Sequence, residues 1–299
     1  MPSLADALVT GPVVLDGGLS TELEERGHDV SSALWSARLL RDDPAAIVAA
    51  HAAFAAAGAQ VATTASYQAT VEGFADAGVA AGEAARLIAS SVALAREGQG
   101  DGGWVAGSVG PYGAMLADGS EYRGDYVDTL GVAALRAFHR PRMELLAAAG
   151  ADVLACETVP AAAEAEALLA EADALGVPIW LSLTTVVDDD GVPRTRRGER
   201  AADVFAMAAD VPAVIAVGVN CTAPSAVGPA VAAAAAAGRP VVVYPNSGET
   251  WGAGARRWTG PPGVSPDDVP AWIGAGARLV GGCCRIRPSD VARIAKMIR

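Results

Sequence analysis

The chain has 299 residues, of which 52% are hydrophobic and 19% are charged, and this composition excludes an intrinsically disordered protein because it supplies ample apolar surface for a core. The formal net charge of −12 disfavours nucleic-acid backbones and anionic membranes as partners, since the long-range field repels them. No stretch is long and apolar enough for a convincing membrane span, and the N-terminus lacks a basic signal region. We therefore expect a cytoplasmic protein that acts on small molecules.

Short apolar runs alternate with alanine-rich helical stretches along the whole chain. The runs predict strands near residues 13–16, 60–65, 104–108, 152–156, 178–183, 213–219, 240–244 and 277–281. The other stretches predict helices near 43–57, 79–97, 128–149, 161–175, 200–209, 224–237, 266–275 and 288–298. Prolines at helix starts, such as Pro44, and glycines after helix ends, such as Gly58, support these boundaries.

This alternation of strands and helices predicts a single-domain (β/α)8 TIM barrel over residues 1–299, with an open doubly wound sheet as the alternative. Three connections are too long for plain turns, namely 109–127, 184–199 and 245–264. Because each follows the end of a predicted strand, we expect them on the barrel face that carries chemistry. For the charged stretch 188–200, a disordered surface loop is the alternative interpretation.

Three of the four cysteines stand at the ends of predicted strands. Cys221 ends the sixth strand, and Cys283 and Cys284 follow the eighth strand after two glycines. In a barrel these positions converge on one face, and three thiolates suit Zn²⁺ while leaving a fourth tetrahedral position open. The alternative is inert buried cysteine, which is the interpretation we adopt for Cys156 at the end of the fourth strand.

A zinc ion with three thiolate ligands is a weak Lewis acid toward water, so the ligand set disfavours hydrolysis. It favours binding of another thiol, whose pKa falls from about 8.5 and which remains nucleophilic as a thiolate. The cysteines therefore predict alkyl transfer to sulfur. A zinc-dependent hydrolase and a non-catalytic zinc-binding protein remain as alternatives.

Polar residues at other strand ends predict a pocket for an amino acid. Asp16 and Glu157 follow the first and fourth strands, where their carboxylates can pair with an ammonium group, and Gly17 and Gly18 can offer backbone N–H groups to a carboxylate. Taken alone, either acid is more often a helix N-cap or a turn residue. Asn220 can brace the site or cap a turn.

Aromatic residues and histidines give weaker signals. Tyr67 and Tyr112 can present ring faces to a cation, although single aromatics at loop edges are usually packing residues. His51 and His139 lie on predicted helices away from strand ends, so we interpret both as surface or helix-packing residues.

Taken together, these segments resemble the homocysteine S-methyltransferases, and most closely the branch that uses S-methylmethionine. The matching segments are LDGGLSTELEERG at 15–27, ASYQAT at 65–70, AGSVGPYGAMLADGSEYRGDY at 106–126, FHRPR at 138–142, ACETVP at 155–160, VGVNC at 217–221, VVYPNSGE at 242–249 and ARLVGGCCR at 277–285. The segment 184–199 departs from the family pattern.

The resemblance implies a zinc-dependent barrel that methylates L-homocysteine to methionine, with S-methylmethionine or S-adenosylmethionine as the sulfonium donor. It implies that Cys221, Cys283 and Cys284 are the zinc ligands. It also implies that Asp16, Gly17 and Glu157 surround the amino-acid head of homocysteine, with Asn220 and Tyr67 as further substrate contacts.

Overall fold

The computed structural model describes residues 1–32, 34–252, 257–260 and 266–298. Its main sheet has eight parallel strands in the order β1-β12-β9-β8-β5-β4-β3-β2. These strands are β1 (Val13–Val14), β2 (Val61–Thr63), β3 (Trp104–Val109), β4 (Val153–Val159), β5 (Ile179–Leu183), β8 (Val214–Asn220), β9 (Val241–Tyr244) and β12 (Ala277–Val280). A parallel bridge between Leu15 and Val61 joins the two ends of the sheet, so the strands form a barrel.

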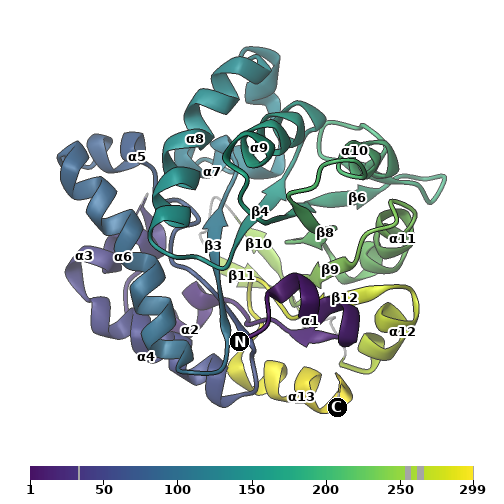
Figure 1. Ribbon diagram of the computed structural model, residues 1–299, viewed down its shortest axis with the longest axis horizontal. Coiled ribbons are helices and arrows are strands. Elements are labelled where there is room, and N and C mark those ends of the chain that lie inside the picture. Colours follow the sequence, from purple (N-terminus) through teal and green to yellow (C-terminus); the bar gives the residue numbers. More distant parts are fainter. Residues whose placement is uncertain (33, 253–256, 261–265, 299) are drawn as a thin grey trace.

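Helices surround this barrel (Figure 1). The predicted ones are present as α4 (Pro44–Ala56), α6 (Ala81–Gln99), α8 (Val132–Ala148), α9 (Ala162–Leu175), α10 (Ala201–Met207), α11 (Pro224–Ala235), α12 (Val269–Gly274) and α13 (Pro288–Ile298). The fold class that the sequence predicts, a (β/α)8 barrel, is confirmed, and the open doubly wound sheet is not what forms.

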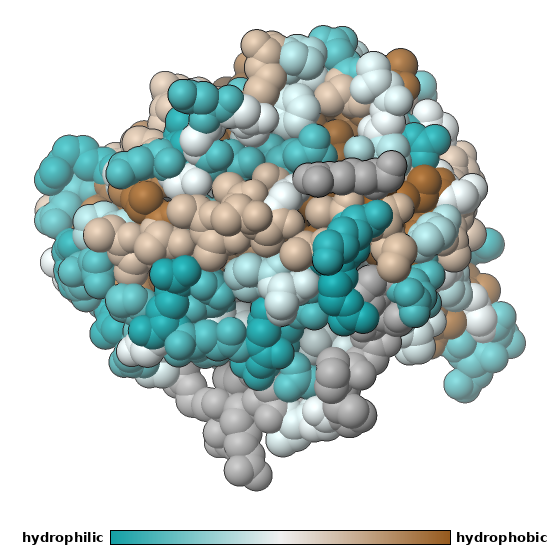
Figure 2. All heavy atoms as spheres, turned by 90° about the horizontal axis from the view of Figure 1, so that it is seen from below, coloured by the Kyte–Doolittle hydropathy of each residue, from teal (hydrophilic) through white to brown (hydrophobic). Residues whose placement is uncertain are grey.

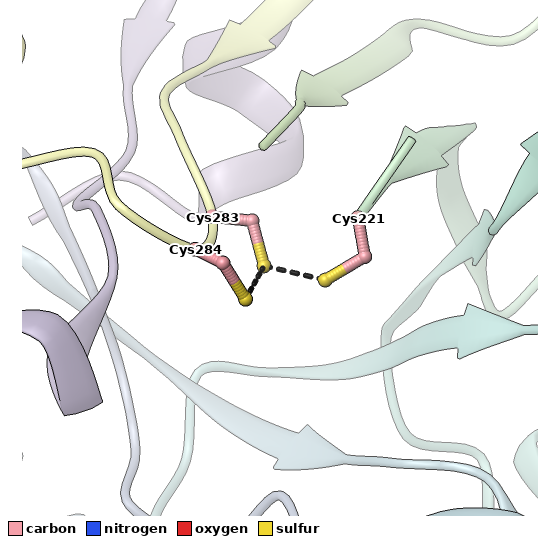
Figure 3. A group of neighbouring side chains, drawn as sticks. All are labelled: Cys221, Cys283 and Cys284. Carbon is pink, nitrogen blue, oxygen red and sulfur yellow. Dashed lines mark hydrogen bonds between the residues drawn. The ribbon is translucent and has the colours of Figure 1, made fainter. Parts of the chain in front are cut away.

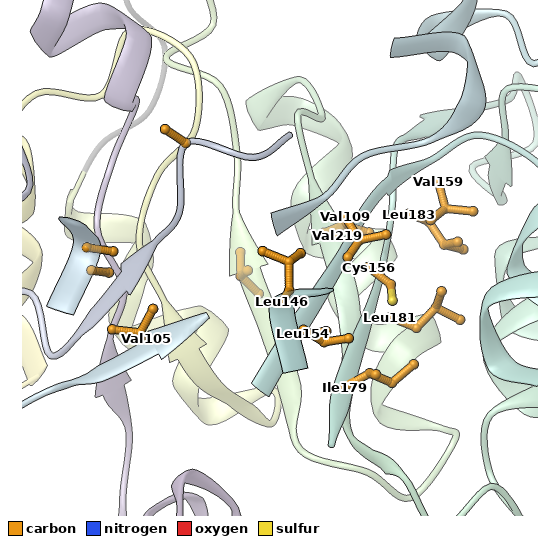
Figure 4. Packing of buried hydrophobic residues seen from close by; sticks show 14 of the residues in the cluster. Val105, Val109, Leu146, Leu154, Cys156, Val159, Ile179, Leu181, Leu183 and Val219 are labelled. Atoms are coloured by element: carbon orange, nitrogen blue, oxygen red, sulfur yellow. The ribbon is translucent and has the colours of Figure 1, made fainter. Parts of the chain in front are cut away.

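The core has two layers because side chains along each strand point alternately to the barrel interior and to the helices. The outer layer, between strands and helices, includes Leu154, Leu181 and Val219, and Cys156 packs among these side chains (Figure 4). The inner layer includes Val61, Trp180 and Leu279. Near-continuous apolar strands such as β5 are therefore buried on both faces.

One end of the barrel is closed by α1 (Leu4–Thr10), which the sequence did not predict. Leu4 and Leu8 join the inner core layer, and the indole Nε1 of Trp104 donates a hydrogen bond of 3.1 Å to the carbonyl of Pro2. In Figure 1 this helix lies across the barrel. The strands run away from α1, so their carboxyl ends open at the opposite end of the barrel.

The long connections carry short elements of their own. The first contains α7 (Tyr112–Leu116), η2 (Ser120–Tyr122) and η3 (Asp125–Asp128), and the second is the hairpin β6 (Thr185–Val187) and β7 (Pro193–Thr195). The hairpin contradicts the alternative of a disordered loop there. The third connection, 245–264, contains β10 (Thr250–Gly252) and β11 (Arg257–Thr259) and lies partly outside the described residues.

Further short elements precede the second and third barrel strands: α2 (Leu19–Glu25), η1 (Trp35–Arg38), α3 (Leu39–Asp42) and α5 (Val71–Asp76), while η4 (Pro266–Asp268) precedes α12. The face seen in Figure 2 has hydrophilic borders, a band of weakly hydrophobic residues and only scattered strongly hydrophobic ones. In the parts of the chain that the structure describes, no helix has both the length and the apolar character needed to cross a membrane.

Candidate metal centre and substrate pocket

Cys221, Cys283 and Cys284 converge at the carboxyl end of the barrel. Their sulfur atoms all lie within 4.8 Å of one another. Cys221 comes from the end of β8 and the other two from the loop after β12, and all three side chains point toward a common space (Figure 3). The convergence that the sequence predicts is therefore present.

The backbone around the cluster is held by specific contacts. Cys221 has a φ of 45°, a left-handed conformation that non-glycine residues rarely adopt and that often occurs at functional sites. The N–H of Cys283 donates to the carbonyl of Pro245 at 2.8 Å, and the N–H of Cys284 donates to Oδ1 of Asn246 at 3.2 Å. The ends of β8, β9 and β12 thus fix the three thiols together.

The donor set fits a thiophilic divalent metal ion. The Sγ atoms of Cys283 and Cys284 are 3.9 Å apart, and two sulfurs bound tetrahedrally to one Zn²⁺ at about 2.3 Å would lie about 3.8 Å apart. Cys221 and Cys283 are closer, with their Sγ atoms at 2.6 Å, so they would separate by about 1 Å to reach that spacing. The S–H groups of Cys283 and Cys284 hold the pKa of Cys221 well below its usual range.

The same contact raises the pKa values of Cys283 and Cys284 well above their usual range, because a thiolate at Cys221 lies beside them. One thiol of the three is therefore readily ionised on its own. Ionising all of them requires a positive charge at their centre, which is what a metal ion supplies.

An inner cavity of about 130 Å³ adjoins the cysteines. All the residues that the sequence predicts for the site line it, namely Asp16, Gly17, Tyr67, Glu157, Asn220, Cys221, Cys283 and Cys284. Three acids line it, and none of its described lining residues is Lys, Arg or His. The cavity is therefore suited to a ligand that brings its own positive charge.

Asp16 and Glu157 are almost fully buried in this cavity. Oδ2 of Asp16 accepts a hydrogen bond from the N–H of Thr63 at 2.7 Å and Oδ1 accepts one from its hydroxyl at 2.9 Å. Burial nevertheless raises the pKa of Asp16 to about 7. Burial likewise raises the pKa of Glu157 to about 8, although hydroxyl groups of Ser108 and Tyr244 contact its carboxylate. An ammonium group placed between these acids would favour their ionised forms.

The two glycines after Asp16 are needed for close packing. A Cβ atom on Gly17 would lie 2.6 Å from the carbonyl oxygen of Ile286, and one on Gly18 would lie 2.6 Å from the carbonyl oxygen of Cys283. The sequence-based expectation that Gly18 offers its N–H to a ligand is wrong, because that N–H donates to the carbonyl of Ile286 at 2.9 Å. The backbone N–H of Gly18 is therefore already used in packing against the loop that carries the cysteines.

Asn220 braces three strands. Its Oδ1 accepts hydrogen bonds from the N–H of Thr158 and the hydroxyl of Ser182, each at 2.7 Å, and its Nδ2 donates to the hydroxyl of Thr158 at 2.8 Å. Thr158 also has a left-handed φ, of 58°. Its hydroxyl contacts both Tyr67 and the sulfur of Cys221. Asn220 thus acts on the site through Thr158.

Sequence reasoning missed several residues of the inner cavity. Tyr244 ends β9, where its hydroxyl accepts a hydrogen bond from Nε1 of Trp180 at 2.9 Å and contacts Glu157. Ser108 lies near the end of β3 and binds Glu157. Both stand at the ends of predicted strands, so the search for polar residues at strand ends, which selected Asp16, could have selected them too. Glu121 and Tyr122 lie on η2 inside a long connection and gave no such signal.

A larger outer cavity of about 660 Å³ adjoins the inner one. Five residues line both cavities: Trp35, Gln68, Glu121, Tyr122 and Cys221. Cys221 therefore lies where the two cavities meet, while Cys283 and Cys284 line the inner cavity. This arrangement allows two molecules to approach the thiols from different sides.

The remaining candidates lie in the core. Cys156 is fully buried, its pKa is raised to about 12 by burial, and it is not part of the thiol cluster. His51 and His139 are both fully buried, which fits helix packing and not the surface. Burial lowers the pKa of His51 to about 4, so it is neutral at physiological pH.

A barrel with three convergent thiols beside an acidic pocket has the geometry of an enzyme that could hold a metal ion, and comparison with known proteins identifies its family. The family model described as homocysteine S-methyltransferase matches residues 13–298. The chain belongs to this family, as the sequence resemblance indicates, and is an enzyme of it.

Individual relatives agree along almost their whole lengths. The chain is 44% identical to a homocysteine S-methyltransferase of Escherichia coli, with 94% of each protein covered, and 42% identical to homocysteine S-methyltransferase 4 of Zea mays, covering 97% of this chain and 90% of that protein. The crystal structure of the homocysteine methyltransferase MmuM from Escherichia coli, metallated form, matches with a TM-score of 0.84 at 42% identity, covering 96% of both chains.

Proposed function

We propose that this enzyme transfers a methyl group from a sulfonium donor to the thiol of L-homocysteine, with Zn²⁺ bound by Cys221, Cys283 and Cys284. The observation that carries the proposal is the position of the thiol cluster between an acidic inner cavity and a larger outer one. S-Methylmethionine is the first choice as donor and S-adenosylmethionine the second. The metallated form of the Escherichia coli relative supports a metal at the cluster.

In this proposal the inner cavity binds homocysteine. Asp16 and Glu157 take its ammonium group, and the backbone at Gly17 lies beside its carboxylate. Tyr67 forms a wall of the cavity and is held by the hydroxyl of Thr158. These contacts orient the substrate so that its sulfur faces the cysteines.

When bound, Zn²⁺ supplies the positive charge that keeps a substrate thiol ionised near neutral pH. The protein side chains position the two reactants. A new bond forms between the homocysteine sulfur and the donor methyl carbon, the bond from that carbon to the sulfonium sulfur breaks, and its electron pair stays on the donor as a neutral thioether. Positive charge on the donor disappears in this step, so the outer cavity has to align it more than to stabilise new charge.

The alternatives have less support. A hydrolase needs a stronger Lewis acid than a metal with three thiolate ligands. A zinc-storage protein needs no acidic pocket beside the metal. A cytoplasmic location is part of the proposal, because reducing compartments keep such thiols free, and all four cysteines are free in the structure.

The test is a donor panel of S-methylmethionine, S-adenosylmethionine and betaine with homocysteine, together with elemental analysis of the same protein. We expect methionine from S-methylmethionine and about one zinc per chain. Cys221→Ala, Cys283→Ala and Cys284→Ala should each abolish turnover, and the matched control Cys156→Ala should retain it. Full activity in exhaustively chelated, metal-free protein would rule out the zinc-dependent reaction.

A further inference from the structure

Glu121 is a buried acid that forms no ion pair with any residue that the structure describes. It lies on η2 and is only 7% exposed, and its Oε2 is buried with no hydrogen-bond partner in the described part of the protein. It lines both cavities. The cost of burying an unpaired carboxylate is recovered when a cationic ligand arrives.

Two arginines line the same outer cavity, and Arg123 pairs with Asp118 and Asp125, which leaves Arg196 as the candidate for binding an anionic group. It follows β7, and its Nε and Nη2 donate to the hydroxyl of Thr184 at 3.2 and 3.1 Å, while its guanidinium lies 5.5 Å from the ring centre of Tyr122. Its sequence neighbours have acidic partners: Arg194 pairs with Asp188.

Arg197 likewise pairs with Asp128. Among the residues that the structure describes, Arg196 has no carboxylate within ion-pair distance. Burial also lowers its pKa, which is the effect of removing a guanidinium from water without pairing it. A half-buried arginine of this kind is suited to a carboxylate ligand, which it can bind through two parallel hydrogen bonds.

We infer that Glu121 and Arg196 form a second amino-acid subsite, in which Arg196 binds the carboxylate and Glu121 the α-ammonium group of the methyl donor. The inference rests on the proposed function and names the donor class: a sulfonium that is also an α-amino acid. Tyr122 follows Glu121 in the sequence, packs against Arg196 and lines both cavities.

The subsite belongs to the donor and not to homocysteine for two reasons. Arg196 lines the outer cavity and does not line the inner one. The inner cavity has its own pair of acids, Asp16 and Glu157, for one ammonium group. The subsite also predicts discrimination: betaine has a carboxylate but no primary ammonium, so it can satisfy Arg196 only.

The experiment combines shortened donors with variants. The donors are S-methylmethionine, dimethyl(3-carboxypropyl)sulfonium, which lacks the ammonium group, and (3-aminopropyl)dimethylsulfonium, which lacks the carboxylate. With the unaltered enzyme, each shortened donor should lose about 10- to 100-fold in kcat/KM, the usual effect of losing one charged hydrogen bond. Glu121→Gln and Arg196→Gln should each raise the KM for S-methylmethionine by a similar factor.

The decisive result is whether the loss in kcat/KM caused by a variant adds to the loss caused by a shortened donor. Arg196→Gln should add little further loss to the donor without a carboxylate, and Glu121→Gln little to the donor without an ammonium group, because each pair is already broken. In the mismatched combinations, Arg196→Gln with the donor that lacks the ammonium group and Glu121→Gln with the donor that lacks the carboxylate, the two losses in kcat/KM should multiply. Arg196→Lys should recover part of the affinity. Zinc content and the KM for homocysteine should stay within about threefold in every variant, since Arg196 lines only the outer cavity and Asp16 and Glu157 take the ammonium group of homocysteine in the inner one.

Arg194→Gln and Glu166→Gln are matched controls, because Arg194 pairs with Asp188, Glu166 is exposed on α9, and neither residue lines either cavity. Losses that multiply in every combination would overturn the subsite, as would a rise in the KM for homocysteine alone. If the unaltered enzyme transfers no methyl group to homocysteine from either S-methylmethionine or S-adenosylmethionine, the proposed function itself fails. Transfer with unchanged donor kinetics in both variants refutes the subsite only.

Discussion

Single residues of the inner cavity show how burial shapes recognition. Asp16 and Glu157 keep their hydrogen-bond donors, yet their pKa values rise to about 7 and about 8 because the cavity removes them from water. Without a ligand both acids carry protons for much of the time at neutral pH. A substrate ammonium would displace those protons and pair with the carboxylates.

Replacing Glu157 tests its assignment to homocysteine. Glu157→Gln should raise the KM for homocysteine by about 10- to 100-fold, because the ammonium group loses a buried ionic partner. The KM for the sulfonium donor should change by less than about threefold. Glu166→Gln, on the exposed side of α9, is the control. A change confined to the donor would place Glu157 in the other half of the site.

The same acids predict a pH dependence of stability. Their pKa values are raised above those of the unfolded chain, so between about pH 5 and 8 the folded state binds more protons than the unfolded state. The unfolding free energy of the metal-free, ligand-free protein should therefore fall as pH rises through this window, by up to about 1.4 kcal/mol per pH unit for each acid.

Urea denaturation at a series of pH values measures this slope. Glu157→Gln and Asp16→Asn should each make it shallower, because each removes one group that holds a proton in the folded protein and releases it on unfolding in this pH window. Identical slopes in the variants and the unaltered protein would contradict the assignment of the raised pKa values to these two residues.

At the scale of elements, α8 supports the site from behind through Arg142. This buried arginine donates to the carbonyl of Tyr67 at 2.9 Å and to that of Gly110 at 2.5 Å, and so ties together the segments that follow β2 and β3. His139, one turn earlier, contacts both Arg142 and the buried Glu164. The FHRPR segment thus positions Tyr67 without reaching the cavity.

Arg142→Lys should destabilise the protein by about 1–3 kcal/mol, because one ammonium group cannot satisfy two buried carbonyls that a guanidinium spans. The urea midpoint measures the loss. Arg140→Lys on the same helix should change stability by less than about 0.5 kcal/mol, since Arg140 is 43% exposed and a lysine can keep its ion pair with Glu171. Equal losses in both variants would show that Arg142 has no special role.

The barrel elements were predictable because short apolar runs alternate with alanine-rich helical stretches along the chain. Strand β5 is a nearly continuous apolar run, and Pro44 and Gly176 mark a helix start and a helix end. The hairpin of β6 and β7 was not predictable, because its charged turn reads as a loop. The pairing of Asn220 with Thr158 was also out of reach, since it depends on the packing of two strands 62 residues apart.

At the scale of the whole molecule, we expect the fold to be independent of metal binding. Both core layers consist of hydrophobic side chains, and α1 closes the barrel at the end away from the cysteines. A core of this kind does not need an ion to fold, in contrast with small zinc-dependent domains.

Exhaustive chelation should therefore leave the far-ultraviolet circular dichroism and a single cooperative unfolding transition intact while abolishing turnover. The melting temperature should fall only by the amount that metal binding to the folded state had added to its stability. Loss of helical signal on chelation would contradict this expectation. Restoring zinc should return activity without a slow refolding phase.

The wide separation of Cys221 from the other two cysteines of the cluster in the sequence determines when the cluster can form during synthesis of the chain. Cys221 and Cys283 are 62 residues apart, β9 lies between their strands, and the last strand, β12, pairs with the first, β1. A chain emerging from the ribosome therefore holds one thiol of the cluster until the loop after β12 has been synthesised. A chain that stops before this loop lacks two of the three thiols and cannot assemble the cluster.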